Sequence, residues 1–402
     1  PDLLILGKEF EKSKEEEIIK AIQLMKKNGK STEFHGGEVH YATTQLLENS
    51  RNDLFLDQKA KFKSACKRHN LKLENMICSI ESWEKTKLLV IGDTILDQYA
   101  ACEAMGMSAE APVLVVKELQ KRNFIGGAAI VASHINALGA NCEFISVVGE
   151  DKSAEIINEE LTKQGISPFL IKDSSRPTTF KKRYVVENQK LFRVSRLNDH
   201  VLSKTIENKV IKRIENIAPS VKGIVISDFV YGVITEKIIK KVISLSKKYN
   251  LKIFGDLQCS SQIGLATKFK DFTLLCPNEK EARIALQDKE SGLENLSNRF
   301  LAETNSEKLI MKLGAQGFVA YDKQKTGKYM SQSFPSLSIN PLDVSGAGDS
   351  LLALMATGIS SGNSFLSTAA LGCCMSAIAV ENMGNEPINH KALKNFLIKI
   401  FK

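Results

Sequence analysis

The chain lacks long apolar stretches and regular cysteine spacing, and both absences limit what it can be. None of its apolar runs reaches the roughly 18 residues that a membrane-spanning helix needs, so we expect no membrane partner. The eight cysteines include no Cys-x-x-Cys pair, and most lie among apolar residues. This distribution argues against a disulfide framework and a zinc site, and it predicts reduced, buried thiols in a cytoplasmic protein.

The net charge of +9 raises the question of nucleic-acid binding, but the basic residues are not clustered. They are spread through amphipathic segments such as Lys204–Arg213 and Lys237–Lys248, and no basic stripe alternates with aromatic residues. We therefore expect no nucleic-acid partner. A positive surface would help to attract phosphorylated small molecules.

At 402 residues the chain is long enough for one large and one small domain. Residues 1–50 predict a partial α/β segment with strands at 3–7 and 31–35, a helix at 14–27 and a further helix opening near Thr43. Residues 51–84 are rich in Lys, Glu and Asn and predict a helical connector. An apolar strand beginning at Lys87 marks a change of character, so we place the main domain at 85–402.

Strands and helices alternate along the main domain. Strands are expected at 87–91, 143–148, 223–227, 251–255, 273–276, 308–312 and 317–321, with helices between them, for example at 128–138, 153–164, 235–249, 279–286 and 348–361. This predicts an α/β fold with a mostly parallel central sheet, helices on both faces, and ligands at the carboxyl ends of the strands. Two β-rich segments, at about 108–122 and 176–198, are expected to form a small second sheet that covers the site and pairs with another subunit.

The segment Asp343-Val-Ser-Gly-Ala-Gly-Asp349 directly precedes a predicted helix. Gly346, Ala347 and Gly348 leave backbone N–H groups unobstructed at the helix N-terminus, an arrangement suited to binding anions. Asp349 would lie in the first helical turn beside that anion, where a carboxylate can accept the proton of an attacking hydroxyl. Taken by itself, the motif also fits a Gly-rich turn followed by a capping acid.

Polar or small residues follow other predicted strands. Asp93 and Asp97 come after the first strand and could accept hydrogen bonds from sugar hydroxyls, with loop capping as the alternative. Gly126 and Gly127 open a helix where a ligand can approach the backbone, although small residues there also fit close packing of a helix on a sheet.

Two later motifs fit nucleotide binding. Asn278 and Glu281 begin a helix, and oxygen ligands at i and i+3 could hold Mg²⁺ directly or through water. An N-cap with an acidic first turn is the alternative. The turn Lys312–Gly317, which includes Gly314, joins two strands and is either a hairpin or a nucleotide contact.

Together and in this order, these motifs resemble the ribokinase (PfkB) family of carbohydrate kinases over about residues 85–402. The glycine pair and the Gly-Ala-Gly-Asp segment are the two family signatures. The resemblance implies a Rossmann-like domain with a β lid, a homodimer formed through that lid, ATP with Mg²⁺, and a monovalent cation near Asp343. It implies that Asp349 is the catalytic base and that Gly346, Ala347 and Gly348 form the anion hole. By the same resemblance, the sugar would contact Asp93, Asp97, Gly126 and Gly127, and Mg²⁺–ATP would contact Asn278, Glu281, Lys312, Gly314 and Gly317.

Within that family the chain most resembles the kinase domains that act on D-glycero-D-manno-heptose 7-phosphate in ADP-heptose synthesis. The matching segments are Gly92–Tyr99, Ser108–Val113, Gly126–Ala129, Arg176–Thr179, Asn188-Gln189 and Ser227-Asp228. In the lid, Lys181 and Arg183 would bind a sugar phosphate, or would only protect an exposed edge strand with charge. Asp228 would also contact the substrate.

Three positions depart from this pattern. Ile130 stands where the family usually has an asparagine that contacts sugar hydroxyls, and Tyr231 and Gln258 stand where the heptose kinases have lysines. Losing an amide and two lysines from the sugar pocket should change the acceptor, while the ATP chemistry stays intact.

The first 50 residues resemble the back half of a cytidylyltransferase-like nucleotidyltransferase. Pro1–Gly7 and Tyr41–Leu47 match that fold, whereas its early His-x-Gly-His motif is absent. His35 and His40 are expected to be loop or cap residues rather than catalysts. Because the chain begins at Pro1 rather than Met, our hypothesis is that it is part of a longer polypeptide with a transferase before the kinase.

The sequence thus predicts an ATP-dependent kinase that phosphorylates a hydroxyl of a heptose-phosphate-like sugar, the anomeric one by family resemblance. Two alternatives stay open at this point. One is a fragment of a bifunctional sugar-nucleotide enzyme, and the other is a non-catalytic sugar- or nucleotide-binding relative with an altered acceptor pocket.

Overall fold

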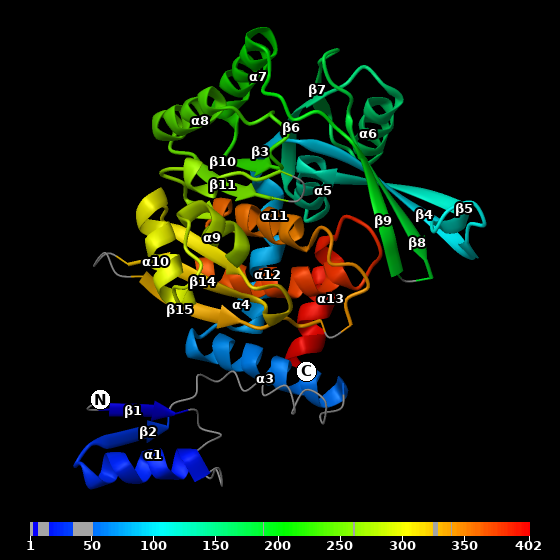
Figure 1. Cartoon of the computed structure of the whole chain (residues 1–402). Coiled ribbons are helices and arrows are strands. Elements are labelled where there is room, and N and C mark those ends of the chain that lie inside the picture. Colours follow the sequence, from blue (N-terminus) through cyan, green and yellow to red (C-terminus); the bar gives the residue numbers. More distant parts are fainter. Residues whose placement is uncertain are drawn as a thin grey trace. The chain divides into compact units, whose positions relative to one another are not determined.

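The structure is a computed structural model that describes residues 3–6, 16–34, 51–187, 189–259, 262–324, 329–338 and 340–402. The helix expected near Thr43, the residues His35 and His40, and Asn188 lie outside the described residues. The chain divides into two compact units, Pro1–Leu56 and Asp57–Lys402 (Figure 1). Each unit is considered by itself.

The smaller unit contains a β-α-β arrangement. Strand β1 (Leu3–Leu6), helix α1 (Glu16–Lys27) and strand β2 (Ser31–Phe34) follow each other, and the two strands pair in parallel with Leu3 opposite Ser31. The two strands and the helix expected from the sequence are therefore confirmed. A parallel pair needs a crossover, which α1 supplies.

The larger unit begins within α3 (Arg51–Arg68), and α4 (Leu73–Glu81) follows. The segment expected to be a helical connector is helical, and it packs on the rest of the unit. The Phe62 ring lies 6.3 Å from Phe334 and 6.2 Å from Phe401, and the Trp83 indole N–H donates to Asn363 Oδ1 at 2.7 Å.

The core of the larger unit is a nine-stranded sheet in the order β15-β14-β13-β12-β11-β10-β3-β6-β7. The strands from β7 to β13 in this order run parallel, whereas β14 pairs antiparallel with β13 and β15 pairs antiparallel with β14 at one edge. The predicted α/β fold with a mostly parallel sheet is thus confirmed. The strands are β3 (Lys87–Gly92), β6 (Asn141–Val148), β7 (Pro168–Lys172), β10 (Gly223–Asp228), β11 (Lys252–Leu257), β12 (Leu274–Leu275), β13 (Lys308–Lys312), β14 (Phe318–Lys323) and β15 (Tyr329–Phe334).

Helices cover both faces of this sheet (Figure 1). On one face, Leu89 and Ile91 of β3 pack in a single cluster with residues of α7, α8 and α10. Side chains alternate along a strand, so Leu88 and Val90 face the opposite side, where α5 and α11 contact the sheet. The helices are α5 (Ala128–Ala137), α6 (Lys152–Lys163), α7 (Lys204–Ile217), α8 (Glu236–Tyr249), α9 (Glu279–Leu286), α10 (Leu293–Thr304), α11 (Ala347–Ser360), α12 (Phe365–Val380) and α13 (His390–Phe401).

A separate four-stranded sheet, the lid, has the order β5-β4-β8-β9 and projects from the body (Figure 1). Its strands are β4 (Thr94–Met107), β5 (Leu114–Gly127), β8 (Thr179–Val186) and β9 (Gln189–Arg196). The two β-rich segments are confirmed as parts of this sheet, but β4 was not expected as a strand. Only Asp93 separates it from β3, so no loop in the sequence marks where the chain passes from one sheet to the other.

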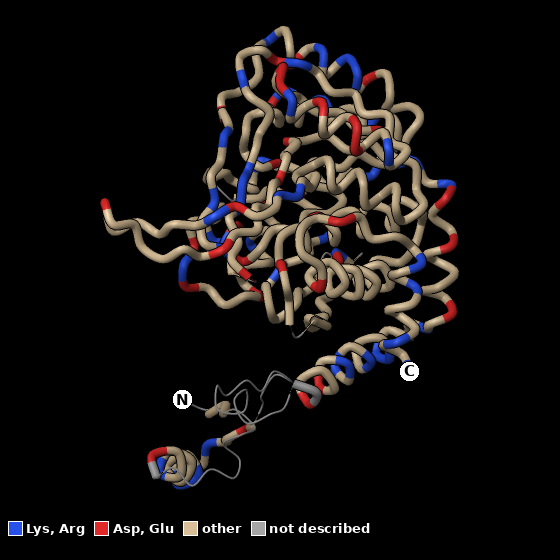
Figure 2. Tube along the Cα trace, turned by 90° about the vertical axis from the view of Figure 1, so that its right-hand side faces the viewer, with Lys and Arg blue, Asp and Glu red and all other residues tan. Residues whose placement is uncertain are grey.

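Cysteines and charges are distributed as the sequence indicated. All eight cysteines are free thiols, and five of them are buried. Figure 2 shows Lys and Arg spread over the larger unit with acidic residues among them. None of the described helices has both the length and the apolar character needed to cross a membrane.

Candidate active site

Acidic side chains gather where the central parallel strands end. The register places Gly92 of β3 and Asp256 of β11 on either side of Ser227 of β10, so the residues that follow these strands share one edge of the sheet. Helix α11 begins beside this edge: the position of a Cβ on Gly348 would lie 3.7 Å from Asp256 Oδ2. The carboxyl ends of the strands and the start of α11 therefore form one site, as the order of the motifs predicted.

Asp349 lies in the first turn of α11 and is buried, with an exposed fraction of 4%. Its Oδ1 accepts a hydrogen bond from the Gln258 amide at 2.7 Å. Burial, with the nearby Asp256 carboxylate, raises the pKa of Asp349 from 3.8 to about 8, although Lys312 and Gln258 act in the opposite direction. A carboxyl group with a pKa close to the pH of the cell is well suited to take up a proton during a reaction.

The N-terminus of α11 has the form of an anion site. Gly346 precedes the helix with a φ of 80°, a conformation that favours glycine, and Ala347 and Gly348 open the first turn. The Lys312 ammonium would lie 3.2 Å from a Cβ on Gly348, and it forms an ion pair with Asp256 at 2.7 Å. The structure therefore brings Lys312 to the helix N-terminus, whereas the sequence had grouped it with the nucleotide-binding turn.

Asp256 links the proton acceptor to this lysine. It is buried, and burial raises its pKa to about 6, while Lys312 opposes the shift and Glu281 adds to it. Burial would lower the pKa of Lys312, but the Asp256 and Glu281 carboxylates raise it above its ordinary value, so the ammonium stays charged. Helix dipole and lysine together favour an anion next to Asp349.

The predicted sugar side lies at the base of the lid. Asp97 of β4 is buried and forms an ion pair with Arg183 of β8. A Cβ on Gly126 would lie only 2.4 Å from Asp97 Oδ2, so a side chain at this position would displace the carboxylate. Asp97 also contributes to the raised pKa of Asp349, after burial and the Asp256 charge. Arg183, expected to bind phosphate, already neutralises Asp97.

Lys181 is buried beneath two aromatic rings. Its ammonium lies 5.4 Å from the Phe229 ring centroid and 5.3 Å from that of Tyr231, within the range of cation–π attraction. Tyr231, one of the three positions expected to depart from the heptose-kinase pattern, thus places an aromatic ring against the Lys181 ammonium. Two of the three residues that depart from the heptose-kinase pattern therefore contact other predicted site residues: Tyr231 covers Lys181, and Gln258 contacts Asp349.

Asp93 and Asp228 both accept hydrogen bonds from backbone N–H groups. Asp93 accepts hydrogen bonds from the backbone N–H groups of Phe229, Tyr231 and Val233 at 2.8, 3.2 and 3.3 Å. Asp228 accepts one from the Val230 N–H at 2.8 Å and pairs with Lys268. Burial and the Asp228 charge raise the pKa of Asp93 to about 7, although the three N–H groups oppose this. Both acids therefore shape the loop 229–233 that carries Tyr231.

Asn278 and Glu281 form a capping box at the start of α9. The Glu281 N–H donates to Asn278 Oδ1, and the Asn278 N–H donates to Glu281 Oε2, each at 2.8 Å. Glu281 Oε1 also accepts from the Cys259 N–H at 3.2 Å. Each of these oxygens keeps a second lone pair, and Mg²⁺ usually retains several waters, so the donor set fits a magnesium ion held through water. Within the described part of the chain, no three His, Cys, Asp or Glu side chains form a metal-binding group.

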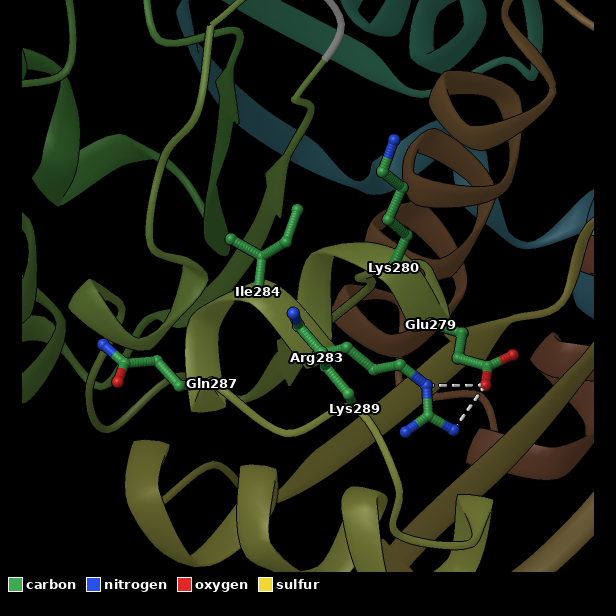
Figure 3. A pocket seen from close by; sticks show the side chains of 6 residues that line it. All are labelled: Glu279, Lys280, Arg283, Ile284, Gln287 and Lys289. Carbon is green, nitrogen blue, oxygen red and sulfur yellow. Dashed lines mark hydrogen bonds and ion pairs between the residues drawn. The ribbon is translucent and has the colours of Figure 1, made fainter.

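The outer side of α9 lines a pocket of about 500 Å³ (Figure 3). Its lining residues are Glu279, Lys280, Arg283, Ile284, Gln287 and Lys289, and Arg283 donates two hydrogen bonds to Glu279, at 2.7 and 2.9 Å. None of the predicted site residues is among them. At the start of α9, Asn278 and Glu281 thus form the capping box, whereas Glu279 and Lys280 line this pocket.

The turn between β13 and β14 is a tight connection. The two strands are antiparallel and are joined through a short 3₁₀ helix at Gly314–Gln316. The Leu313 N–H donates to the Gly317 carbonyl at 2.8 Å, and a Cβ on Gly317 would lie 2.1 Å from the Phe334 carbonyl. Gly314 has open space where a Cβ would lie. Gly317 therefore meets a packing requirement, and Gly314 leaves its side of the turn accessible.

The Asp343 carboxylate is saturated by protein donors. Its Oδ1 accepts from Lys190 Nζ at 2.5 Å and from the Ser345 N–H at 2.9 Å, and its Oδ2 accepts from the Tyr99 hydroxyl at 2.5 Å and from the Gly384 N–H at 3.3 Å. Burial would raise the pKa of Asp343, but the hydrogen bonds from Lys190, Tyr99 and Ser345 lower it to about 2. This arrangement does not fit a monovalent cation bound by Asp343, because the Lys190 ammonium already supplies the positive charge.

The sequence missed two residues near the site. Lys190 is on β9 of the lid, 153 positions before Asp343, and nothing in its neighbourhood marks it as an ion-pair partner. Asn385 follows α12, and a Cβ on Gly346 would lie 2.2 Å from its Oδ1. Asparagine is common in loops, so only the folded arrangement draws attention to it.

Comparison with known proteins agrees with this geometry. A family model described as pfkB family carbohydrate kinase matches residues 85–392. The chain belongs to this family. It is therefore a sugar kinase, a phosphotransferase with an alcohol group as acceptor.

Curated relatives include the bifunctional protein HldE of Campylobacter jejuni, which is 32% identical over 322 residues, covering 78% of this chain and 65% of the relative. HldE of Helicobacter hepaticus is 28% identical over 316 residues, covering 77% of this chain and 64% of the relative. The chain thus spans slightly less than two thirds of the length of these relatives.

Solved structures of sugar kinases share the fold. Phosphofructokinase-2 from Escherichia coli superposes with a TM-score of 0.65 at 15% identity, covering 79% of this chain and 100% of that one. Ribokinase from Thermotoga maritima gives 0.61 at 19% identity, covering 78% and 99%. Arabidopsis thaliana ribokinase in complex with ribose and ATP gives 0.59 at 18% identity, covering 78% and 98%.

Proposed function

We propose that this pfkB-family kinase transfers the γ-phosphoryl group of ATP to a hydroxyl, the anomeric one by family resemblance, of a heptose-phosphate-like sugar. The observation that supports this most directly is the buried Asp349, with a pKa raised to about 8, in the first turn of a helix whose N-terminus also faces Lys312. The similarity to HldE proteins and the segments shared with heptose kinases support the class of acceptor.

The chemistry requires one proton transfer and one displacement. Asp349 takes the proton from the acceptor hydroxyl as its oxygen bonds to the γ-phosphorus, and the bond from that phosphorus to the bridging oxygen breaks, which releases ADP. The N–H groups at the start of α11 and the Lys312 ammonium would stabilise the charge on the phosphoryl group in transit. Asp97, backed by Arg183, would accept hydrogen bonds from sugar hydroxyls.

Magnesium and the nucleotide would bind at the neighbouring strand ends. Asn278 and Glu281 would hold Mg²⁺ through water, and the ion would neutralise the phosphates of ATP. The accessible side of the turn at Gly314 would border the nucleoside. We propose no role for a monovalent cation at Asp343, since Lys190 occupies its carboxylate.

We also propose that two copies of the chain pair through their lids. The lid exposes several large apolar side chains, which a monomer would leave in water: Met105, Met107, Val113, Leu114, Val115, Leu119, Phe192 and Val194. For the smaller unit, the β-α-β arrangement of β1, α1 and β2 is compatible with a nucleotidyltransferase-like segment, so a bifunctional parent protein remains the hypothesis for residues 1–50.

The function is tested by measuring ADP release with D-glycero-D-manno-heptose 7-phosphate, fructose 6-phosphate, ribose and their relatives as acceptors. We expect sugar-dependent ADP release, highest with a heptose or heptose phosphate. Release that is the same with and without every sugar would reject the kinase assignment and would favour a binding protein instead.

A further inference from the structure

Asn385 is held in place by its two neighbours. The Gly384 N–H donates to Asp343 Oδ2 at 3.3 Å, and a Cβ on Gly384 would lie 2.6 Å from the Phe124 ring, so this glycine fits closely beneath the base of the lid. On the other side, Glu386 pairs with Arg122 of β5 at 2.5 Å. The segment that presents Asn385 is therefore tied both to the loop before α11 and to the lid.

The Asn385 amide lies between the anion site and the sugar side. A Cβ on Gly346, the residue before α11, would lie 2.2 Å from Asn385 Oδ1. A Cβ on Gly126 would lie 3.4 Å from Asn385 Nδ2 and 2.4 Å from Asp97 Oδ2. One side chain thus contacts both glycine motifs, and its amide shares the Gly126 surface with the carboxylate expected to bind sugar.

The amide oxygen of Asn385 is buried and accepts no hydrogen bond from any described residue. Such an oxygen is costly to leave without a partner, and most buried polar atoms in native proteins have one. At the same time, Ile130 of α5 is fully buried and apolar, so this position offers no side-chain amide to a ligand. The structure has an amide near the glycine pair, but it comes from the loop after α12.

We propose that Asn385 positions the acceptor sugar, by hydrogen bonding through its side-chain amide to a hydroxyl next to the one that Asp349 deprotonates. This rests on the proposed function and adds a residue that determines specificity. A ligand with two neighbouring hydroxyls would satisfy the amide and the Asp97 carboxylate together. A polyol is therefore the class of ligand that fits, and a sugar deoxygenated at the position facing Asn385 would not.

The test compares Asn385→Leu with Asn382→Leu, a matched control on the same segment whose side chain is exposed and donates to the Ile378 carbonyl at 3.3 Å. With the best acceptor of the panel, Asn385→Leu should raise the sugar KM about tenfold and leave the ATP KM within about twofold, as expected for one lost hydrogen bond. Sugar binding measured by calorimetry without ATP should weaken by the same factor. The control should behave as the wild type.

Thermal unfolding without ligand distinguishes positioning from a purely structural role. Leucine replaces an amide whose oxygen has no partner, so Asn385→Leu should unfold at the same temperature as the wild type or higher. A lower melting temperature with an unchanged sugar KM would reject the proposal and assign Asn385 to the loop alone. If the wild type neither binds nor phosphorylates any sugar, the proposed function fails and this inference fails with it. An active wild type with an Asn385→Leu sugar KM within twofold would reject only the role of Asn385.

Discussion

Replacing Asp349 by asparagine should stop catalysis and make the protein more stable at neutral pH. Asparagine keeps the size of the side chain but accepts no proton, and a general base contributes about 10²–10⁴-fold to a rate, so kcat should fall by at least two orders of magnitude. ATP binding should be nearly unchanged, because the N–H groups of α11 and Lys312 remain.

The stability effect follows from the raised pKa of Asp349. The folded protein holds the proton up to a pH of about 8, whereas an unfolded carboxyl loses it near 3.8. Because the folded state binds the proton more tightly, this group stabilises the fold below pH 3.8, and the stability is lost as the pH rises towards 8. At 1.36 kcal/mol for each pKa unit, the loss amounts to roughly 4 kcal/mol at pH 7. Asparagine does not titrate, so the variant should avoid this loss.

Urea unfolding at pH 5 and pH 8 measures the effect. Trp83 is the only tryptophan and is fully buried in the larger unit, so its fluorescence reports the unfolding of that unit. The advantage of Asp349→Asn over the wild type should grow with pH between these values, and Asp271→Asn, at an exposed acid, should show no such trend. A near-normal kcat would refute the assignment of the base, and an advantage that does not change with pH would refute the electrostatic argument.

Four further predictions concern the titration of Asp349, its neighbour Gln258, the pairing of Lys190 with Asp343, and assembly through the lid. Since the base must be deprotonated, wild-type kcat/KM for the sugar should rise about tenfold per pH unit and level off near pH 8, where Asp349 titrates; a flat profile between pH 6 and 8 would contradict this. Gln258→Lys would place a cation beside Asp349, lower its pKa and move the same profile to lower pH; an unmoved profile would show that residue 258 does not set the pKa. Lys190→Met should reduce kcat/KM about tenfold by leaving Asp343 without its cation, and potassium should restore part of the loss, whereas the wild type should respond equally to sodium and potassium. Leu119→Lys in the lid should convert a dimer into a monomer in light scattering; a wild-type monomer would reject pairing through the lid.

Sequence patterns predicted what depends on local structure. The strand ends and the Gly-Ala-Gly-Asp segment are recognisable because the positions of a strand, a turn and a helix start follow from residues close in the chain. The sequence also predicted a helix cap at Asn278 as the alternative to a metal site, and the structure contains this capping box. The family and the fold followed from these local features taken in order.

Contacts across long sequence separations could not be predicted in this way. Asp97 and Arg183 were each expected to face the substrate, but they lie 86 positions apart and neutralise one another when β4 and β8 pair. Lys190 and Asp343 meet only because the lid folds over the loop before α11. Such pairings depend on the register of strands, and a single sequence does not reveal which of many charged residues will face each other.

The pairing of charges distinguishes Asp349 from four of its acidic neighbours. Four acids at this end of the sheet each have a positive partner: Asp97 with Arg183, Asp228 with Lys268, Asp256 with Lys312, and Asp343 with Lys190. Asp349 accepts a hydrogen bond from a neutral group, the Gln258 amide, and burial with the Asp256 and Asp97 carboxylates raises its pKa, although Lys312 opposes the shift. A cation beside a carboxylate lowers its affinity for protons, as the pKa of about 2 for Asp343 illustrates. Asp349 thus keeps a raised pKa of about 8 in the first turn of α11, which is where the proposed phosphoryl transfer needs its proton acceptor.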